Sequence, residues 1–203
     1  MSVIKIVITG GPCGGKSSAL EYLRSAFTEK GYRVLLIEET ATELIKGGVS
    51  PSSCGCEADF QRIRLGLQIC KEDFFNEAAK TIRGADALII CDRGILDCRA
   101  YMPAERVDNM LADYGLDEKG ALARYDAVFH MTTAAKGAAE YYTTANNSAR
   151  TEPPETAAML DDRVIDAWSG HKYRRIIDNS TGFAKKLERL KDGITAFLDN
   201  RKT

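Results

Sequence analysis

Short hydrophobic runs and longer stripes with helical spacing follow one another along the chain. The runs are rich in β-branched residues and predict five strands, at residues 2–9, 32–37, 87–91, 125–131 and 174–178. The third run is apolar at every position, which is typical of a strand covered on both faces. The runs therefore predict a parallel sheet with helices on both sides.

The segments between these runs carry apolar residues at spacings of three and four. They predict helices at residues 18–27, 41–46, 58–83 and 155–168, shorter helical stretches between 95 and 114, and a closing helix from 183. We expect the long helix to pack through the stripe Phe60, Ile63, Leu67, Cys70, Phe74, Ala78 and Ile82. Because strand and helix alternate from end to end, the chain predicts one α/β domain over residues 1–203, a three-layer α/β/α sandwich around a mainly five-stranded parallel sheet.

The first predicted strand runs into residues 10–17, Gly-Gly-Pro-Cys-Gly-Gly-Lys-Ser, which match G-x-x-x-x-G-K-[ST]. In this motif backbone N–H groups surround phosphates, the lysine reaches the outer phosphates and the serine hydroxyl reaches Mg²⁺. The preceding strand and following helix are the context that the motif requires. The expected nucleotide-binding residues are Gly11, Pro12, Cys13, Gly14, Gly15, Lys16, Ser17 and Ser18, with Lys16 also catalytic and Ser17 also a Mg²⁺ ligand.

Charged residues follow two other strands, at the sheet edge where parallel sheets bind ligands. Asp92 closes the third strand and is expected to hold Mg²⁺, or alternatively to cap the next helix. Arg93 beside it can neutralise a transferring phosphoryl group. Glu38 and Glu39 end the second strand, and one of them can take a proton from an acceptor hydroxyl. Strand alternation sends these two to opposite faces; we favour Glu39 as the base, and the alternative is that both are solvated.

Two groups of polar residues are candidates for ligand recognition. On the long helix, Gln61, Arg64 and Gln68 recur at spacings of three and four. If this helix borders the nucleotide site, we expect these three side chains to bind the phosphate acceptor. The alternative is that they form a solvent-facing side of the helix. After the fifth strand, Asn179 and Ser180 are expected near the nucleotide base, or as a cap of the closing helix.

Residues 132–155 are small and polar and predict a mobile lid inserted in the domain. A charged lid closes on a phosphoryl group and excludes water. We expect Arg150 to supply this charge, with Lys136 and Arg163 as the alternatives, because a guanidinium spreads its charge over several donors. Plain surface charge is the other interpretation of all three.

Composition narrows the classes of partner. The formal net charge of −1 argues against nucleic acid or a membrane surface as the main partner, and no apolar run is long enough for a membrane span. The chain enters its first strand at once, so we expect no signal peptide and a cytoplasmic protein. Cys13, Cys70 and Cys91 are expected to be reduced, packed thiols, and the pair Cys54 and Cys56 a surface turn rather than a metal site.

Several segments together resemble one family. They are residues 8–17, Glu38-Glu39-Thr40-Ala41, Phe60-Gln61, Cys91-Asp92-Arg93-Gly94-Ile95-Leu96-Asp97, Tyr125-Asp126-Ala127-Val128-Phe129, Arg150-Thr151-Glu152 and residues 170–179. The chain resembles the P-loop AAA-like ATPase/kinase domain that the ribosylnicotinamide kinase half of the bifunctional NMN adenylyltransferase shares with a GTP-binding photoreceptor-channel translocation protein. The resemblance implies a nucleoside-kinase-like fold, nucleotide binding, Mg²⁺, and a substrate-binding role for Asp97.

These observations predict a Mg²⁺-dependent kinase that moves the γ-phosphate of ATP to a hydroxyl of a small, nucleoside-like acceptor. GTP is possible, but the guanine-specific N-K-x-D motif is absent from the chain, which favours ATP. The alternative is a nucleotide-binding switch, or slow NTPase, that acts through a protein partner. A motor-type ATPase is disfavoured because Arg93 stands where a second acidic residue would follow Asp92.

Overall fold

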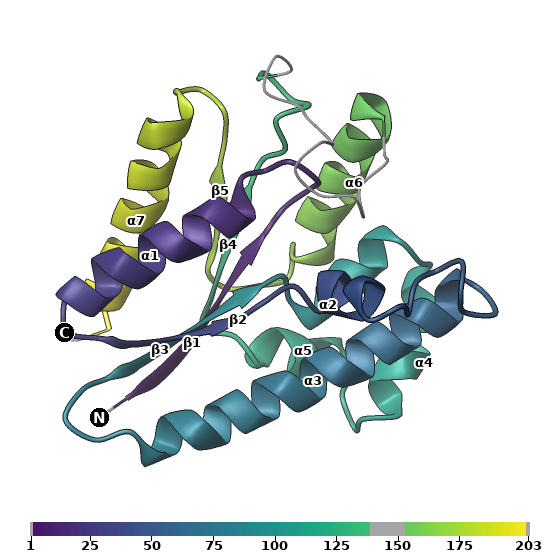
Figure 1. The fold of residues 1–203 in the computed structure, drawn as a ribbon, viewed down its shortest axis with the longest axis horizontal. Coiled ribbons are helices and arrows are strands. Elements are labelled where there is room, and N and C mark those ends of the chain that lie inside the picture. The colour runs from purple at the N-terminus through teal and green to yellow at the C-terminus, as the bar shows by residue number, and fades with distance from the viewer. Residues whose placement is uncertain (1, 139–152, 202–203) are drawn as a thin grey trace.

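Five parallel strands form the centre of the molecule, in the order β2–β3–β1–β4–β5 (Figure 1). The computed structural model describes residues 2–138 and 153–201. The strands are β1 (Val3–Thr9), β2 (Arg33–Ile37), β3 (Ala87–Asp92), β4 (Ala127–Met131) and β5 (Arg174–Ile177). The predicted parallel sheet is confirmed, and each strand lies within two residues of its predicted bounds.

Helices cover both faces of this sheet and complete the three layers (Figure 1). On one face, α1 (Lys16–Glu29) packs against α7 (Phe183–Asp199). The other face carries α3 (Glu57–Thr81), the 3-10 helix η1 (Ile95–Ala100), α4 (Ala104–Ala112), α5 (Glu118–Ala123) and α6 (Pro154–Ala167). The short helix α2 (Thr40–Lys46) follows β2 and contacts α3. The helix α5 has no counterpart among the predicted elements.

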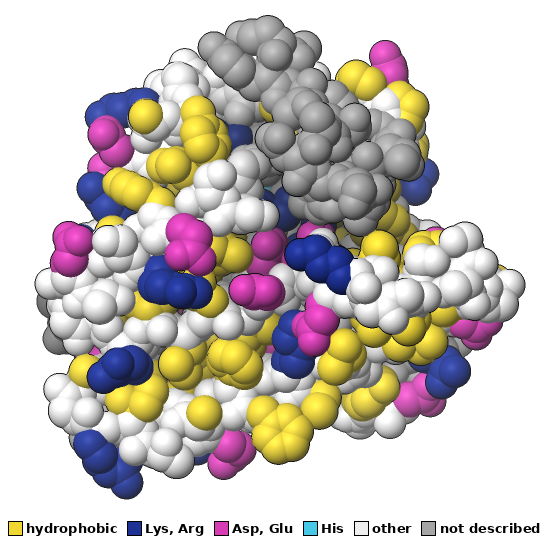
Figure 2. Space-filling model, viewed as in Figure 1, with side chains coloured by type: hydrophobic (Ala, Val, Ile, Leu, Met, Phe, Trp, Pro, Cys, Tyr) yellow, Lys and Arg dark blue, Asp and Glu magenta, His cyan; other side chains and the backbone are white. Residues whose placement is uncertain are grey.

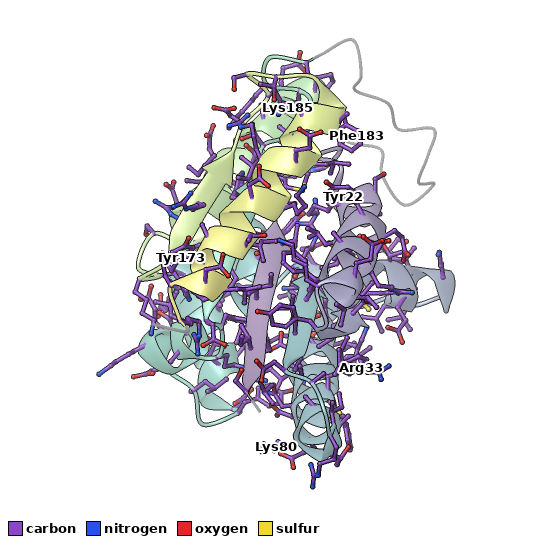
Figure 3. The ribbon with its side chains drawn as sticks, turned by 90° about the vertical axis from the view of Figure 1, so that its left-hand side faces the viewer. Tyr22, Arg33, Lys80, Tyr173, Phe183 and Lys185 are labelled. Carbon is purple, nitrogen blue, oxygen red and sulfur yellow. The ribbon has the colours of Figure 1, made fainter. Side chains whose placement is uncertain are left out.

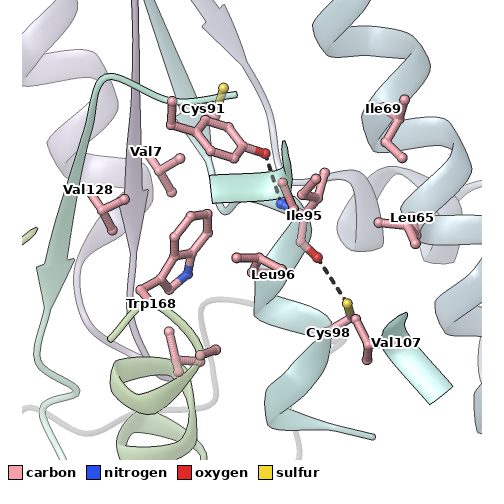
Figure 4. Close-up of a cluster of buried hydrophobic side chains, with 14 of the residues drawn as sticks. Val7, Leu65, Ile69, Cys91, Ile95, Leu96, Cys98, Val107, Val128 and Trp168 are labelled. Atoms are coloured by element: carbon pink, nitrogen blue, oxygen red, sulfur yellow. Dashed lines mark hydrogen bonds between the residues drawn. The ribbon is translucent and has the colours of Figure 1, made fainter. Parts of the chain in front are cut away.

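Two hydrophobic cores hold the layers together, one on each face of the sheet. In the core under α3 and α6, Trp168 is fully buried between Val7, Val128 and Leu96 (Figure 4). Backbone polar groups of η1 are satisfied inside this core, because Ile95 N donates to the Tyr125 hydroxyl (2.9 Å). The cores therefore fix η1, and with it the loop that follows β3, against the sheet.

The face of α3 that packs on the sheet is not the predicted one. Ile63 and Phe74 belong to the expected stripe but are 40% and 70% exposed, and Cys70 is exposed as well. Figure 2 shows hydrophobic side chains on the surface where α3 runs in Figure 1. The buried residues of α3 are instead Phe60, Gln61, Arg64, Leu65, Gln68, Ile69, Glu72 and Ala79. The predicted stripe is therefore confirmed at Phe60 and wrong at Ile63, Cys70, Phe74 and Ala78, because polar side chains of this helix are buried inside the fold.

The beginning of the predicted lid is part of the core. Thr132 and Thr133 directly follow β4 and are 8% and 0% exposed. These two residues pack behind the loop after β1, so an exposed lid would have to begin after them; the lid itself stays a prediction. Residues 139–152 of the expected lid, including Arg150, lie outside the described part of the chain.

The ends of β1 and β3 bring the predicted chemistry together. The two strands pair in parallel, with Ile8 opposite Asp92, so residues 10–17 and Arg93 leave the same edge of the sheet. β1 is the middle strand, with neighbours reached by crossovers on both sides, and such a position is where α/β sheets bind ligands. In the described ranges, no helix combines the length and the apolar character needed to cross a membrane.

Candidate functional site

The loop between β1 and α1 has a backbone that only glycine allows at its tightest point. Gly10 has φ +138°, and a Cβ atom there would lie 2.1 Å from the carbonyl oxygen of Met131. A Cβ on Gly14 would lie 2.7 Å from the same oxygen. The loop is thus pressed against the end of β4, as a phosphate-binding turn requires for close backbone approach.

Lys16 is the first residue of α1 and is buried inside this loop. Its Nζ donates hydrogen bonds to the carbonyl oxygens of Gly10 (3.0 Å) and Gly11 (2.8 Å). Ser17 and Ser18 follow in the first turn of α1 and are exposed. The loop therefore places an ammonium group, two hydroxyls and the N–H end of a helix dipole at one point, a set that suits a polyphosphate.

Asp161 of α6 clamps the loop from behind. This carboxylate is fully buried and accepts from Gly11 N (2.8 Å), Thr133 N (3.1 Å), His130 Nε2 (3.0 Å) and Lys136 Nζ (3.1 Å). Burial by itself raises the pKa of Asp161, but the hydrogen bonds from His130, Gly11 and Lys136 outweigh it and hold the pKa well below the usual range. The carboxylate therefore stays ionised and ties residues 130–136 and α6 to the loop.

A second clamp comes from α7. Lys186 is buried, and its Nζ donates to the carbonyl oxygen of Thr132 (2.7 Å) and to Oδ1 of Asn179 (2.7 Å). Burial lowers the pKa of Lys186 to about 8. The Asn179 amide in turn donates to the carbonyl oxygens of Thr133 and Lys136, at 2.7 Å each. Together these contacts hold residues 132–136 against the phosphate loop.

These contacts bear on the residues expected at the nucleotide base. Asn179 uses its amide within the second clamp, and Ser180 is exposed and donates to Asp178 Oδ1 (2.6 Å). Neither caps α7, whose N-cap residue is Gly182 without a side-chain hydrogen bond. Contact with the base stays a prediction for both residues.

Phe183, the first residue of α7, covers the outer side of the loop. Its side chain is 48% exposed, and its ring atoms come within 2.4 Å of the position that a Cβ on Gly15 would take. Figure 3 shows Phe183 at the end of α7 nearer to Tyr22 of α1 than to Tyr173. An aromatic face thus borders the phosphate loop on the side of α1 and α7.

Arg93 directly follows β3 and joins the loop to the second strand. It has φ +69°, an uncommon backbone for an arginine, and it is 6% exposed. Its guanidinium donates to the Glu39 carboxylate, to the carbonyl oxygen of Gly10 (3.1 Å) and to Asp97 (3.4 Å). Burial lowers the pKa of Arg93, but Glu39 and the other neighbouring acids outweigh it, so the pKa lies well above the ordinary value. Arg93 therefore carries a permanent positive charge beside the loop.

The two glutamates after β2 have different surroundings. Glu39 is the N-cap residue of α2, and besides Arg93 it accepts a hydrogen bond from the Thr42 hydroxyl (2.7 Å). Glu38 has an exposed side chain, while its carbonyl oxygen accepts from Lys71 Nζ (3.1 Å). The geometry thus directs Glu39 toward the loop and Arg93, and Glu38 toward the surface.

Asp92 and Asp97 are both buried but differ in their contacts. Asp92 lies opposite Ile8 in the sheet, two residues before the loop starts on β1. Asp97 accepts from the Thr9 hydroxyl (2.7 and 2.8 Å) and from the Trp168 indole (2.7 Å), besides Arg93. These contacts fit a positioning role for Asp97, which orients Arg93; contact of Asp97 with an acceptor stays a prediction.

The polar side chains of α3 are inside the fold, so their interpretation as a solvent-facing surface is wrong. Gln68 donates to Glu72 (2.9 Å) and to the carbonyl oxygen of Arg93 (3.4 Å). Gln61 accepts from Arg64 Nε (2.8 Å) and donates to Glu57 (2.8 Å). This row of polar groups leads from the end of β3 along α3, and contact of these residues with an acceptor stays a prediction.

The remaining basic candidates have partners outside the loop. Lys136 is held by Asp161 (3.1 Å) and Asp162 (2.6 Å), and Arg163 is exposed and donates to the carbonyl oxygen of Ala100 (3.3 Å). A lid role for Lys136 would require these ion pairs to open. Arg150, the favoured candidate, lies outside the described residues.

Cysteine and metal chemistry do not add a second centre to the described ranges. Cys54 and Cys56 are free thiols, Cys56 being exposed and donating to Asp59 (3.3 Å). Among the described residues, no group of three or more His, Cys, Asp or Glu side chains is arranged to hold a metal ion. A Mg²⁺ ion held through one or two protein oxygens together with phosphate oxygens needs no such group.

Sequence reasoning overlooked Asp161 and Lys186, the residues that clamp the loop. A signal for each exists in the pattern. Asp161 stands between Ala157 and Val164 on the buried face of α6, and Lys186 precedes Leu190 on that of α7. A charged residue on an otherwise apolar helix face is rarely buried without a specific partner, and this is the observation that would have found them.

Comparison with known proteins gives one result that bears on the whole chain. A family model described as an AAA domain matches residues 5–186. The matched range contains the loop, both clamps, Asp92, Arg93 and the polar face of α3. The search of curated proteins finds no match.

Proposed function

The chain belongs to the AAA domain family, a P-loop family of nucleotide-binding proteins, and on that premise we propose that it transfers the γ-phosphoryl group of ATP to a hydroxyl of a small acceptor. The observation that carries this proposal is the ion pair between Glu39 and Arg93. The same guanidinium also donates to the carbonyl oxygen of Gly10 in the phosphate loop. A switch that only binds or slowly hydrolyses a nucleotide needs no buried carboxylate–guanidinium pair at this point. A transferase needs both a proton acceptor and a fixed positive charge there.

The residues present fit a nucleotide and Mg²⁺. The backbone of Gly10 and Gly14 approaches β4 so closely that a Cβ would collide with it, and this packing keeps the loop curved around its centre. Lys16 already points into the loop, where it can exchange its carbonyl partners for phosphate oxygens. Ser17 and Asp92 supply the hard oxygen donors that Mg²⁺ prefers, and a bound Mg²⁺ would neutralise phosphate charge.

The chain's own groups then account for the transfer. The acceptor oxygen forms a bond to the γ-phosphorus while the bond from that phosphorus to the β–γ bridging oxygen breaks, and ADP leaves. Glu39 receives the hydroxyl proton, held in place by Arg93 and Thr42. Arg93 and Lys16 stabilise the charge that spreads over the phosphoryl oxygens.

The test compares Glu39→Gln with Glu38→Gln, a matched pair one residue apart. ADP formation is measured with Mg²⁺ and ATP, with and without a panel of nucleosides that includes nicotinamide riboside. Glu39→Gln should lower acceptor-dependent kcat by about 100-fold or more, in the range of a lost general base, and leave ATP affinity within a factor of about three. Glu38→Gln should behave like the wild type, because Glu38 is exposed.

Two results would refute the transferase. One is equal loss in both variants, and the other is ADP release that no acceptor in a broad panel increases. The second result would favour a nucleotide-binding switch acting through a protein partner. Loss of Mg²⁺-ATP binding in Lys16→Ala, measured by calorimetry, checks the nucleotide site independently of the acceptor.

A further inference from the structure

Arg64 holds a buried positive charge that the rest of the site does not use. Its side chain is on α3 and is 4% exposed. Its Nε donates to the amide oxygen of Gln61 (2.8 Å), which is a neutral partner. Within the described ranges, its Nη2 is buried without a hydrogen-bond partner, and Arg64 forms no ion pair.

This arrangement differs from that of two other buried cations, which have acidic partners. Arg93 pairs with Glu39 and Asp97, and Lys5 pairs with Glu72 (3.1 Å). A buried guanidinium without an opposite charge is strongly unfavourable, because it has lost its water without a compensating interaction. A ligand that provides the missing negative charge is one reason for a fold to retain such a group.

Arg64 lies within reach of the proposed reaction centre. Gln68 lies four residues after Arg64 on α3, a rise of about 6 Å along the helix. Its side-chain amide donates to the carbonyl oxygen of Arg93 (3.4 Å). Tyr101 connects the two sides: burial raises the pKa of its hydroxyl, and the charges of Arg93, Asp97, Glu39 and Arg64 all act on it. Arg64 and the Glu39–Arg93 pair therefore both lie near the Tyr101 hydroxyl.

We propose that Arg64 binds an anionic oxygen group, a carboxylate or a phosphate, on the end of the acceptor remote from the hydroxyl that is phosphorylated. This inference rests on the proposed function and specifies its substrate class. A guanidinium binds both kinds of oxyanion through paired N–H donors. The same charge repels a cationic acceptor, so a nucleoside with a positively charged base should be a poor substrate.

The experiment uses acceptor pairs that differ only in the anionic group. Nicotinamide riboside and nicotinic acid riboside form the carboxylate pair, and uridine and uridine 3′-monophosphate form the phosphate pair; all four keep the 5′-hydroxyl. Binding is followed through the fluorescence of Trp168, the single tryptophan of the chain, whose indole donates to Asp97 (2.7 Å). ADP formation from Mg²⁺-ATP is measured in parallel.

Arg64→Met removes the charge at similar length, Arg64→Lys keeps it, and Arg62→Met is the control at an exposed arginine of the same helix. The anionic member of at least one pair should bind about 10- to 150-fold more tightly than its partner, as expected for a hydrogen-bonded charge pair. Arg64→Met should abolish this preference and Arg64→Lys should restore part of it. The melting temperature of Arg64→Met should be unchanged or raised, because an unpaired buried charge is replaced by an apolar side chain.

The outcomes separate this inference from the proposed function. Equal binding within both pairs, tighter binding of the cationic riboside, or an unchanged preference in Arg64→Met would overturn the role of Arg64. The role of Arg64 would also be overturned if Arg64→Met lost most of its stability while Arg64→Lys bound all four compounds as the wild type does. Arg64 would then be a structural residue. Selective binding of the anionic compounds without ADP formation would refute the transferase and leave the anion site standing.

Discussion

Asp161→Asn tests whether the phosphate loop depends on the clamp behind it. In the native protein Oδ1 of Asp161 accepts from Gly11 N, Thr133 N and His130 Nε2, and Oδ2 accepts from Lys136 Nζ. An asparagine keeps one oxygen for the first three donors but turns an NH₂ group toward the Lys136 ammonium. The substitution therefore removes the charge from three hydrogen bonds and replaces an ion pair by two facing donors.

The expected loss of unfolding free energy at pH 7 is about 2–4 kcal/mol. A hydrogen bond to a charged group contributes about 1.5–3 kcal/mol, and breaking a buried ion pair costs about 3–5 kcal/mol before the structure relaxes. Asp162→Asn is the control, because Asp162 also contacts Lys136 (2.6 Å) but its side chain is 68% exposed. The control should change stability by no more than about 0.5–1 kcal/mol. Urea unfolding, followed by circular dichroism, measures both.

The pH dependence gives an independent check with a defined sign. The folded-state pKa of Asp161 is held well below the usual range, so its stabilising contribution is complete at pH values more than about one unit above the unfolded-state pKa of about 3.9. That contribution is lost as the pH falls below about 5, because the unfolded state then binds a proton that the folded state does not. The stability difference between wild type and Asp161→Asn should therefore shrink below pH 5. A difference smaller than about 0.5 kcal/mol at pH 7, or one that grows in acid, would refute the clamp.

Three further predictions follow from other contacts. Gly10→Ala should destabilise the protein by more than about 2 kcal/mol in urea unfolding, and Gly31→Ala by only about 1 kcal/mol, since both have positive φ but only Gly10 faces a backbone atom; equal losses would contradict this. Burial lowers the pKa of Lys186 to about 8, so between about pH 8 and 10 the unfolded chain holds a proton that the folded protein has lost. The unfolding free energy of the wild type, relative to that of Lys186→Met, should therefore rise by on the order of 2 kcal/mol from about pH 7.5 to about pH 9.5 in urea titrations. The same difference at both pH values would contradict this. Cys70 is exposed and should be alkylated by iodoacetamide in the native state, whereas Cys98, buried and with a raised pKa, should react only on unfolding, as peptide mass spectrometry can show.

The sequence predicted the sheet and the phosphate loop because both depend on local rules. A β-branched run that ends in a glycine-rich turn before a helix specifies strand, loop and helix together, whatever packs around them. The choice between Glu38 and Glu39 depends on which carboxylate meets Arg93, and that contact joins residues 54 positions apart. Period-two alternation separates the two side chains but does not say which face the arginine occupies.

The clamps were beyond sequence reasoning for a related reason. Asp161 reaches Gly11 across 150 residues, and Lys186 reaches Thr132 across 54. Each is a charged residue on a helix face that otherwise packs in the core, where a pattern based on hydrophobicity counts it as a mismatch. Such mismatches are stable only when several backbone groups and side chains converge on the charge, and that convergence appears only in three dimensions.

The long helix α3 shows where the hydrophobic pattern fails and what the failure means. Its apolar stripe should be buried, yet Phe74 is 70% exposed, while Gln61, Arg64 and Gln68 lie inside the fold. Gln68 is held by neighbouring groups, but Arg64 is not neutralised by any described carboxylate. Burying that charge opposes folding, so stability alone would favour the opposite face of the helix. Departures from local rules of this kind are expected at functional or strained sites. The buried polar face of α3 is therefore an observation, independent of the phosphate loop, that supports the proposed binding of an anionic acceptor.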